Sequence, residues 1–546
     1  MKYKRRHYKM FKRLLSYKNL GFSGIFMIMT LLYIAFAVKP WTSLAGNIYS
    51  GDDNSYYGYA SSIVNDFDYD ASNNFVEGSI GGVSEKTGKL ILSHPVGTGY
   101  MLVPFYLVAK PLVLIDSFCR KINFNQRHVL FFIAMCVGIF IYSYAACLLL
   151  CEALKTMGYK EELSEFSVLL TFWGSIIPVC VFKRPIFSHV PEFFLISLLI
   201  FSIVKLREKK QLEIRHLFIL TFLNAAVLIT RWNDVHIVFF TSMFLFSAPK
   251  VGFAQKIKNI LLYTGGIFII FFFTQSMAWK TFMGGYFRLP FNPATVRGTS
   301  ANMLPFALLN NFFHVWFALD WGIVYTMLPF AVGVTVFFFR CPLQWYKGKV
   351  QDVLTRIVLV GLPFILVLKW QSQAEYYGYR FLISLVPFAA VGIAELLNLC
   401  DKWVDNNKNL LKIIFVFIVM FNFFLILPFE YTERTSLTLG VSSMGGEGWI
   451  NNAYIKNALS AYFTLPLKEF AGLFLRGFAA AYAFAVAAFL IPQIIPSLPE
   501  KLCDYYVIRT VDQLYVLLFY PFLCMLSVFL INKLYTLLIK GNIKRD

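Results

Sequence analysis

The sequence predicts an all-α transmembrane protein. Of its 546 residues, 58% are hydrophobic and only 15% are charged, which leaves too little polar surface for soluble domains. Apolar runs of roughly 17 to 25 residues recur along the chain, the length that a helix needs to cross ~30 Å of hydrocarbon. A helix satisfies its own backbone hydrogen bonds in lipid, and these runs are too long and too uniformly apolar for barrel strands.

The net charge of +20 and the nine cysteines indicate which partners and which stabilising bonds to expect. The basic residues cluster in short loops between apolar runs, as the positive-inside bias requires, so we expect the lipid bilayer and no nucleic acid as a partner. The cysteines are scattered and form no Cys-x-x-Cys pair, which indicates neither a disulfide framework nor a metal knot.

The first element is an apolar helix at Leu20–Val38 that follows a basic segment, residues 1–19. We interpret it as an uncleaved signal-anchor, with the basic segment in the cytoplasm and residues 40–127 outside. About thirteen helices are expected in all, the later ones at residues 129–151, 164–182, 190–205, 216–230, 234–247, 259–279, 321–339, 353–369, 381–397, 411–427, 470–491 and 513–538.

Three basic loops, at 205–211, 250–258 and 340–349, are typical of the cytoplasmic side and fix the order of the spans. They fit only if 95–115, which Pro104 and Pro111 are expected to break, and 302–319 lie in or dip into the outer leaflet as interfacial helices. The predicted divisions are residues 1–19, a transmembrane catalytic module at 20–397, and C-terminal helices at 398–546 with an external loop at 428–469. The orientation of the last two helices stays open.

An acidic pair, Asp52 and Asp53, follows the first span directly. The plain interpretation is a helix cap. Because Tyr56 and Ala60 follow Asp52 by four and eight residues, they share its side of a helix, which would hold the carboxylate rigidly above the membrane. Beyond capping, a general base or a cation ligand are the two functions that such a pair suggests at this place, with Tyr57 beside it.

Other polar residues that the charge bias leaves unexplained fall on the same outer side. His94 lies in the external loop, and a His and a Glu three residues apart begin a later span at His189 and Glu192. Outward cations match phosphate oxygens and are the candidate phosphate ligands, although each is also suited to anchoring at the interface. These cations are Lys280, Arg231, Arg288 and Arg380, and Glu375 lies close to the last of them.

Together these segments resemble the GT-C superfamily, the polytopic glycosyltransferases that use polyprenyl-phosphate-linked sugars, and above all the bacterial members related to protein O-mannosyltransferases and aminoarabinose transferases. The segments that carry the resemblance, in order, are Asp52–Tyr56 with Ala60, His94–Phe105, Leu228–Arg231, Trp279–Gly284 with Pro290, Phe317–Gly322 with Pro329, and Tyr377–Phe381 with Pro387. Beyond about Leu397 nothing specific matches.

The resemblance implies a GT-C fold with interfacial helices in the first external loop, and an inverting transfer in which Asp52 acts as the base on an acceptor hydroxyl. It also implies a polyprenyl-phosphate-linked sugar as donor, a glycan, glycolipid or protein as acceptor, and a bacterial inner membrane with the active site facing outward. Asp53 stands where the family more often has Glu. No further cofactor and no metal ligand is assigned, and a requirement for a divalent metal is left open.

Two other functions stay open on the sequence. A transporter or flippase for a glycolipid or envelope polymer would show ionisable residues at the bilayer midplane and paired internal repeats. No convincing repeat is visible, and the acids lie at the surface. A non-catalytic scaffold in envelope assembly is the third reading.

Overall fold

The computed structural model describes residues 17–37, 52–73, 82–92, 94–120, 129–182, 185–207, 213–247, 252–287, 312–313, 315–317, 323–340, 349–369, 380–400, short pieces between 404 and 418, and 511–535. These residues are helical apart from turns and one isolated bridge between Val83 and Leu90. The all-α class is therefore confirmed for the described part of the chain.

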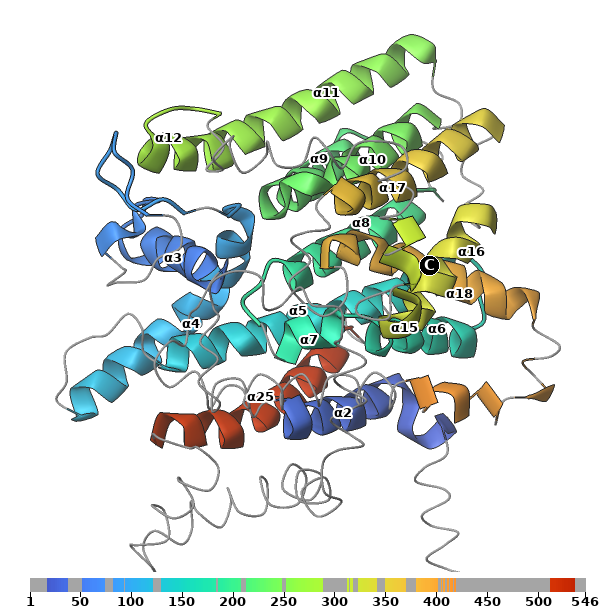
Figure 1. Ribbon diagram of the computed structural model, residues 1–546, viewed down its shortest axis with the longest axis horizontal. Helices are drawn as coiled ribbons and strands as arrows, with labels where there is room; N and C mark the ends of the chain where they lie inside the picture. Colours follow the sequence, from blue (N-terminus) through green and yellow to red (C-terminus); the bar gives the residue numbers. More distant parts are fainter. Residues whose placement is uncertain are drawn as a thin grey trace, which may run out of the picture. The chain divides into compact units, whose positions relative to one another are not determined.

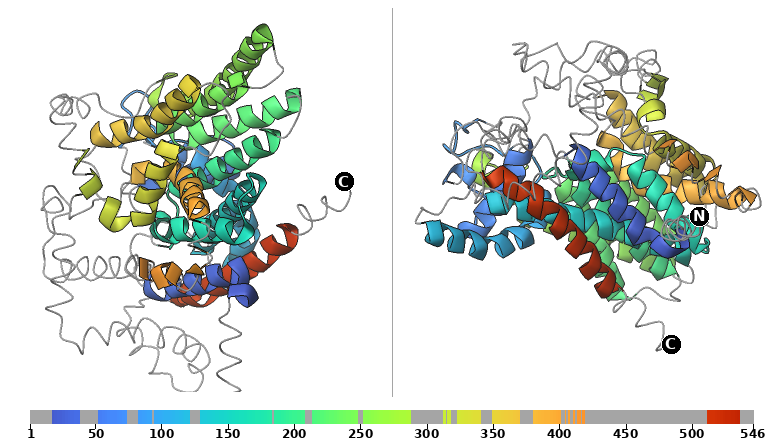
Figure 2. Two further views of the ribbon diagram at one scale, coloured as in Figure 1. Left: turned by 90° about the vertical axis from the view of Figure 1, so that its right-hand side faces the viewer. Right: turned by 90° about the horizontal axis from the view of Figure 1, so that it is seen from below.

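The chain divides into two compact units, residues 1–45 with 465–546, and residues 46–464. In the first unit the described helices are α2, Tyr17–Ala37, and α25, Val511–Tyr535 (Figures 1 and 2). The Asn532 amide donates a hydrogen bond to Ser23 Oγ at 2.9 Å, so α2 and α25 contact each other in this unit.

The second unit holds the remaining described helices (Figure 1). In chain order they are α3 Asp52–Asn65, η2 Ala71–Asn73, α4 Gly97–Arg120, α5 Val129–Thr156, α6 Glu161–Trp173, α7 Ile177–Phe182, α8 His189–Arg207, α9 Ile214–Thr230, η3 Trp232–Asp234, α10 Val235–Ser247, α11 Phe253–Phe271, η4 Phe272–Ser276, α12 Met277–Met283, α15 Ile323–Thr326, α16 Leu328–Arg340, α17 Lys349–Lys369, η7 Arg380–Leu385 and α18 Val386–Leu399.

Five of the described helical stretches are long and apolar enough to cross a membrane, and the chain is a multi-pass membrane protein. They are Gly97–Phe118, Leu130–Thr156, His189–Arg207, Phe253–Met283 and Phe381–Leu399. The expected spans at 411–427 and 470–491, the interfacial segment at 302–319 and the loop at 428–469 lie wholly or largely outside the described residues.

The expected break of the segment after His94 is wrong. Pro104 and Pro111 lie inside one continuous helix, α4. A helix tolerates proline in this setting when neighbouring groups take up the freed carbonyls. One face, with Leu102, Tyr106 and Val113, is buried, while the other face is apolar and exposed. Its interfacial position stays a prediction, since its length also suffices to cross a membrane.

The span expected at 164–182 is also interrupted, because α6 ends at Trp173 and α7 begins at Ile177. Ser175 between them donates its hydroxyl to the Phe172 carbonyl at 2.9 Å and accepts the Ile177 N–H at 3.3 Å. A side chain that bonds the local backbone in this way competes with the helical ladder and ends it.

The tightest helix packing joins α16 and α18. A Cβ on Gly392 would lie 1.9 Å from the Gly333 carbonyl oxygen, and one on Gly333 would lie 2.3 Å from the Ala389 oxygen. The two backbones are thus in direct contact at this crossing, as small residues allow in membrane helices. The residues of η7 lead straight into α18, so this rigid pair fixes the position of η7.

Candidate functional site

Helix α3 carries the acidic pair. Asp52 is its first residue, and the Asp52 side chain lies outside the part that the structure describes. The Asp53 side chain is buried, with 4% of its surface exposed. Tyr56, Tyr57 and Ala60 are buried as well, so the helix turns its tyrosine-rich side into the protein.

His94 packs on α3. Its ring centroid lies 5.3 Å from that of Tyr56, and its Nδ1 lies 3.3 Å from Ser55 Oγ. The Tyr59 hydroxyl donates to the His94 carbonyl at 3.1 Å. Three residues of α3 therefore hold His94 next to the acidic end of that helix.

The start of α4 is clamped between α3 and the end of α9. A Cβ on Gly97 would lie 2.5 to 2.6 Å from the backbone of Ile229 and Thr230, and one on Gly99 would lie 2.4 Å from Tyr59 Cβ. Only glycine permits both approaches. The loop that carries His94 therefore lies directly beside Thr230, the residue before Arg231.

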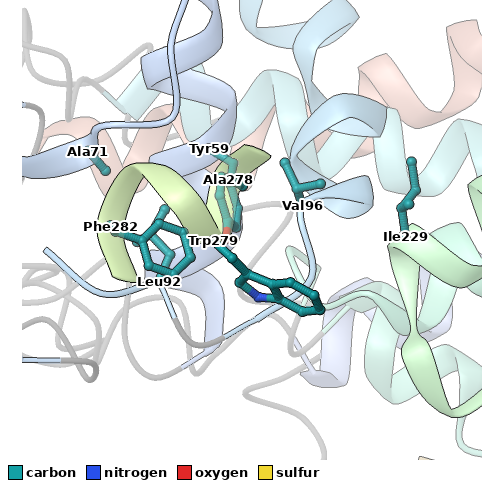
Figure 3. Packing of buried hydrophobic residues seen from close by; sticks show 8 residues of the cluster. All are labelled: Tyr59, Ala71, Leu92, Val96, Ile229, Ala278, Trp279 and Phe282. Carbon is teal, nitrogen blue, oxygen red and sulfur yellow. The ribbon is translucent and has the colours of Figure 1, made fainter. Parts of the chain in front are cut away.

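A buried hydrophobic cluster joins the same three regions to α12 (Figure 3). Tyr59 of α3, Val96 before α4 and Ile229 of α9 pack with Trp279 of α12. Ala71, Leu92, Ala278 and Phe282 complete the cluster. The Trp279 ring also meets the Trp232 ring edge to face at 5.3 Å.

A π-helical turn, η4, supplies the polar link in this junction. It separates α11 from α12 and buries Gln275, whose Oε1 accepts the Val96 N–H at 2.9 Å. An extra residue in a helical turn shifts the side chains that follow it, and such turns are frequent at functional sites. Here the shift turns a polar residue of a phenylalanine-rich run toward the segment that precedes α4.

A buried ionic cluster forms the other half of the site. Arg231 Nε lies 3.2 Å from Glu192 Oε2, and the side chains are 9% and 1% exposed. Arg231 also contacts His189 Nδ1. A guanidinium only donates, so it can bond an imidazole nitrogen only where that nitrogen carries no proton. Asp234, also buried, interacts electrostatically with Glu192 and Arg231.

The ends of two helices place these charges. His189 and Glu192 are in the first turn of α8, where the helix dipole favours an acid, and Arg231 directly follows the last residue of α9, where it favours a cation. The backbone of Arg231 is extended and leads into the single turn η3. The break in the apolar sequence at Arg231 is therefore a sharp turn between α9 and α10, a corner at which the guanidinium is buried in the protein.

The beginning of η7 covers this cluster. The guanidinium carbon of Arg231 lies 5.3 Å from the ring centroid of Phe381. Arg380 precedes that phenylalanine, but its side chain lies outside the described part, as do Arg288 and Glu375 entirely. The backbone position of Arg380 thus lies next to a residue that stacks on Arg231.

Lys280 lies on α12, one residue after Trp279 of the hydrophobic cluster. It is exposed, and its Nζ donates to the Tyr286 hydroxyl at 2.6 Å. Within the described ranges, no three His, Cys, Asp or Glu side chains are placed to hold a metal ion.

Sequence reasoning missed Gln275, Asp234 and Phe381. Gln275 was visible as a polar residue in a run of phenylalanines, and Asp234 belongs to the same Arg-Trp-Asn-Asp break as Arg231. Phe381 ends the segment Tyr377–Phe381, one of those that carry the resemblance, but nothing in that segment indicates a contact with Arg231.

No family model and no curated protein sequence matches this chain. Among solved structures, the chain is similar to the Archaeoglobus fulgidus oligosaccharyltransferase, tethered through a disulfide bond to an acceptor peptide that contains the NVT sequon. The TM-score is 0.39 and the sequence identity 11%, and the similarity covers 91% of this chain and 60% of that chain. This chain thus matches less than two thirds of that protein's length.

Proposed function

We propose that this protein is a GT-C-type glycosyltransferase of the bacterial inner membrane. It would move a sugar from a polyprenyl-phosphate donor to a hydroxyl of a glycan, glycolipid or protein acceptor on the outer face. One observation carries the proposal. The close approaches of Gly97 to Ile229 and Gly99 to Tyr59 join the helix of the acid pair to the corner that bears Arg231.

In the proposed reaction Asp52 accepts the proton of the acceptor hydroxyl while the hydroxyl oxygen attacks the anomeric carbon. The bond from that carbon to the phosphate oxygen breaks, and polyprenyl phosphate leaves with inversion. A carboxylate needs no large pKa shift to act as a base at neutral pH, and general-base catalysis contributes about 10² to 10⁴ in rate. Asp53, buried beside it, assists by holding the start of α3.

Cations are needed where negative charge grows on the leaving phosphate. Lys280, Arg288 and Arg380 are the proposed ligands of that phosphate. Arg231 belongs to the same group by sequence, but its contacts with Glu192 and His189 support a positioning role, in which it holds η7 through Phe381. Tyr56, Tyr57 and His94 shape the acceptor side, and His189, Glu192 and Glu375 complete the site.

The test is Asp52→Asn in the full-length chain, with Asp66→Asn as the matched control because Asp66 is an exposed acid just beyond the other end of α3. Membranes that contain each variant receive a polyprenyl-phosphate-linked radiolabelled sugar, and the label transferred to endogenous acceptor is counted. Transfer should fall by at least about 10²-fold in Asp52→Asn and stay near wild type in the control. Near-normal transfer by Asp52→Asn at equal expression rejects the assignment of the base.

A glycolipid transporter is the second candidate, and the buried ionic cluster at the start of α8 favours it, since ionisable residues within membrane segments often line transport pathways. Flipping of a labelled glycolipid across proteoliposomes that survives loss of both Asp52 and Asp53 would favour transport over transfer.

A further inference from the structure

Where α12 ends, the chain folds back on α11. Gly284 has the left-handed conformation, with φ 69°, and closes α12, and Phe287 also has a positive φ of 55°. The fold brings Tyr286 over Phe272, with ring centroids 5.3 Å apart, and Phe287 over Phe268, at 6.2 Å. A non-glycine residue with positive φ is uncommon, so this return is a specific feature of the turn.

The result is an exposed aromatic ladder, which we define as Phe268, Phe272, Tyr286 and Phe287. Phe272 also meets Phe268 at 6.4 Å and Phe287 at 6.0 Å, so the four rings are connected. Phe268 and Phe287 remain 57% and 53% exposed. Rings that stack on one another and still face outward form a stiff apolar surface, unlike aliphatic side chains, which lose more rotamer freedom when something binds.

One end of the ladder carries a positive charge. Lys280 Nζ donates to the Tyr286 hydroxyl at 2.6 Å and lies 4.7 Å from the centre of that ring. Among the described residues, no carboxylate lies within 4.0 Å of this ammonium. The cation is therefore held in place by an aromatic residue and its charge is available to an anion.

The ladder is also continuous with the candidate site. Phe271, the neighbour of Phe272, packs on Trp279 at 5.7 Å, and Trp279 belongs to the cluster that holds the external loop. The π turn that begins at Phe272 connects α11, which carries Phe268, to α12, which carries Lys280. A molecule bound along the ladder with its anionic end at Lys280 would thus end beside α12 and the start of α4.

We propose that the aromatic ladder and Lys280 bind the polyprenyl phosphate of the donor, with the phosphate on Lys280 and the first isoprene units along the rings. Charge complementarity selects this occupant: an apolar chain that ends in a phosphate matches an apolar strip that ends in an ammonium. The inference rests on the proposed function, because it locates the carrier lipid of that reaction. It adds a defined surface on α11 and α12.

The experiment measures binding, so it needs neither the sugar nor the acceptor. The full chain is purified in detergent, and undecaprenyl phosphate is titrated while the bound fraction is read by native mass spectrometry. Undecaprenol, which lacks the phosphate, and phosphatidylglycerol, an anionic lipid without isoprene units, are titrated in parallel. Three variants are compared: Phe268→Ala with Phe287→Ala, Lys280→Gln, and Phe339→Ala as a control for an exposed phenylalanine on α16.

The double phenylalanine variant should weaken undecaprenyl phosphate about tenfold, and undecaprenol similarly, while Phe339→Ala changes neither. Lys280→Gln should weaken undecaprenyl phosphate about tenfold and leave undecaprenol unchanged. If the double variant unfolds, Phe268→Ala alone tests the rings in its place. Tyr286→Phe keeps the ring, loses the hydroxyl that holds Lys280, and should weaken only the phosphate.

If all variants bind undecaprenyl phosphate with the same affinity, the aromatic ladder and Lys280 are not its binding site. If the wild type binds phosphatidylglycerol as tightly as undecaprenyl phosphate, the surface binds anionic lipids in general, and the assignment to the carrier lipid is overturned. Wild-type protein that binds no undecaprenyl phosphate at all rejects the donor class and with it the proposed function. Binding that is tight but indifferent to the ladder rejects this inference alone.

Discussion

Arg231 can be tested by removing its charge. Arg231→Leu would leave the buried Glu192 and Asp234 without their guanidinium. At the 3.2 Å separation of Arg231 and Glu192, the Coulomb attraction is about 5 kcal/mol for an effective dielectric constant of about 20. The cost of desolvating the two charges offsets part of this attraction. Removing the partner of a buried charge nevertheless typically destabilises the folded protein by about 3–5 kcal/mol.

The measurement is equilibrium unfolding of the full chain in mixed micelles with increasing dodecyl sulfate. Arg231→Leu, Glu192→Gln and the double variant form a cycle. The double variant should lose less than the sum of the single losses, because it leaves no unpaired charge between these two positions. Arg215→Leu is the control, since its contact with Glu213 is exposed and such pairs contribute about 0–1 kcal/mol.

Arg231 has no such structural role if Arg231→Leu loses no more stability than Arg215→Leu, or if the energies of the cycle are additive. Either result would mean that water or another group solvates Glu192 when Arg231 is absent. The cluster would then be no structural unit, and the positioning role proposed for Arg231 would fail with it.

Three further results are expected. Gly392→Ala should destabilise by about 1–3 kcal/mol in the same unfolding assay, because its Cβ meets backbone of α16, whereas Gly265→Ala, with nothing within 4 Å, should not destabilise. Gln275→Leu leaves the Val96 N–H without its acceptor, so amide exchange at Val96 should speed up, and no change there would contradict the π-turn link. Burial alone would raise the pKa of Asp70, but hydrogen bonds from Ser72 and Lys89 outweigh it and lower that pKa below its usual 3.8. This stabilisation is present above pH 3.8 and lost as the pH falls through the lowered value, so protease resistance of residues 82–92 should decline only in that acid range.

Helix positions were predictable where charge bounds an apolar run. The spans expected at 190–205 and 216–230 correspond to His189–Arg207 and Ile214–Thr230. The hydrophobic pattern did not predict the interruption between α6 and α7 at Ser175, nor the π turn that contains Gln275. Each involves a single polar side chain, Ser175 or Gln275, and an average over a window of apolar residues does not register one such residue.

The sequence predicted which site residues share a face of one helix, but not which residues of different helices come into contact. The three-residue spacing of His189 and Glu192 places them on one helical face, which the structure shows. That Arg231 would lie between them depends on how α8 packs against α9, a register that no local pattern contains. The same holds for His94, whose contact with Tyr56 requires the path of the loop between α3 and α4.

The surroundings of the two described cations separate their roles. Arg231 is 8% exposed and is engaged by a carboxylate, an imidazole and an aromatic ring, so its charge is already compensated within the protein. Lys280 is exposed and held by a neutral hydroxyl. A phosphate gains most from a cation whose charge no carboxylate offsets. Basic residues that look equivalent in the sequence therefore have different surroundings, which supports the positioning role proposed for Arg231 and the phosphate contact proposed for Lys280.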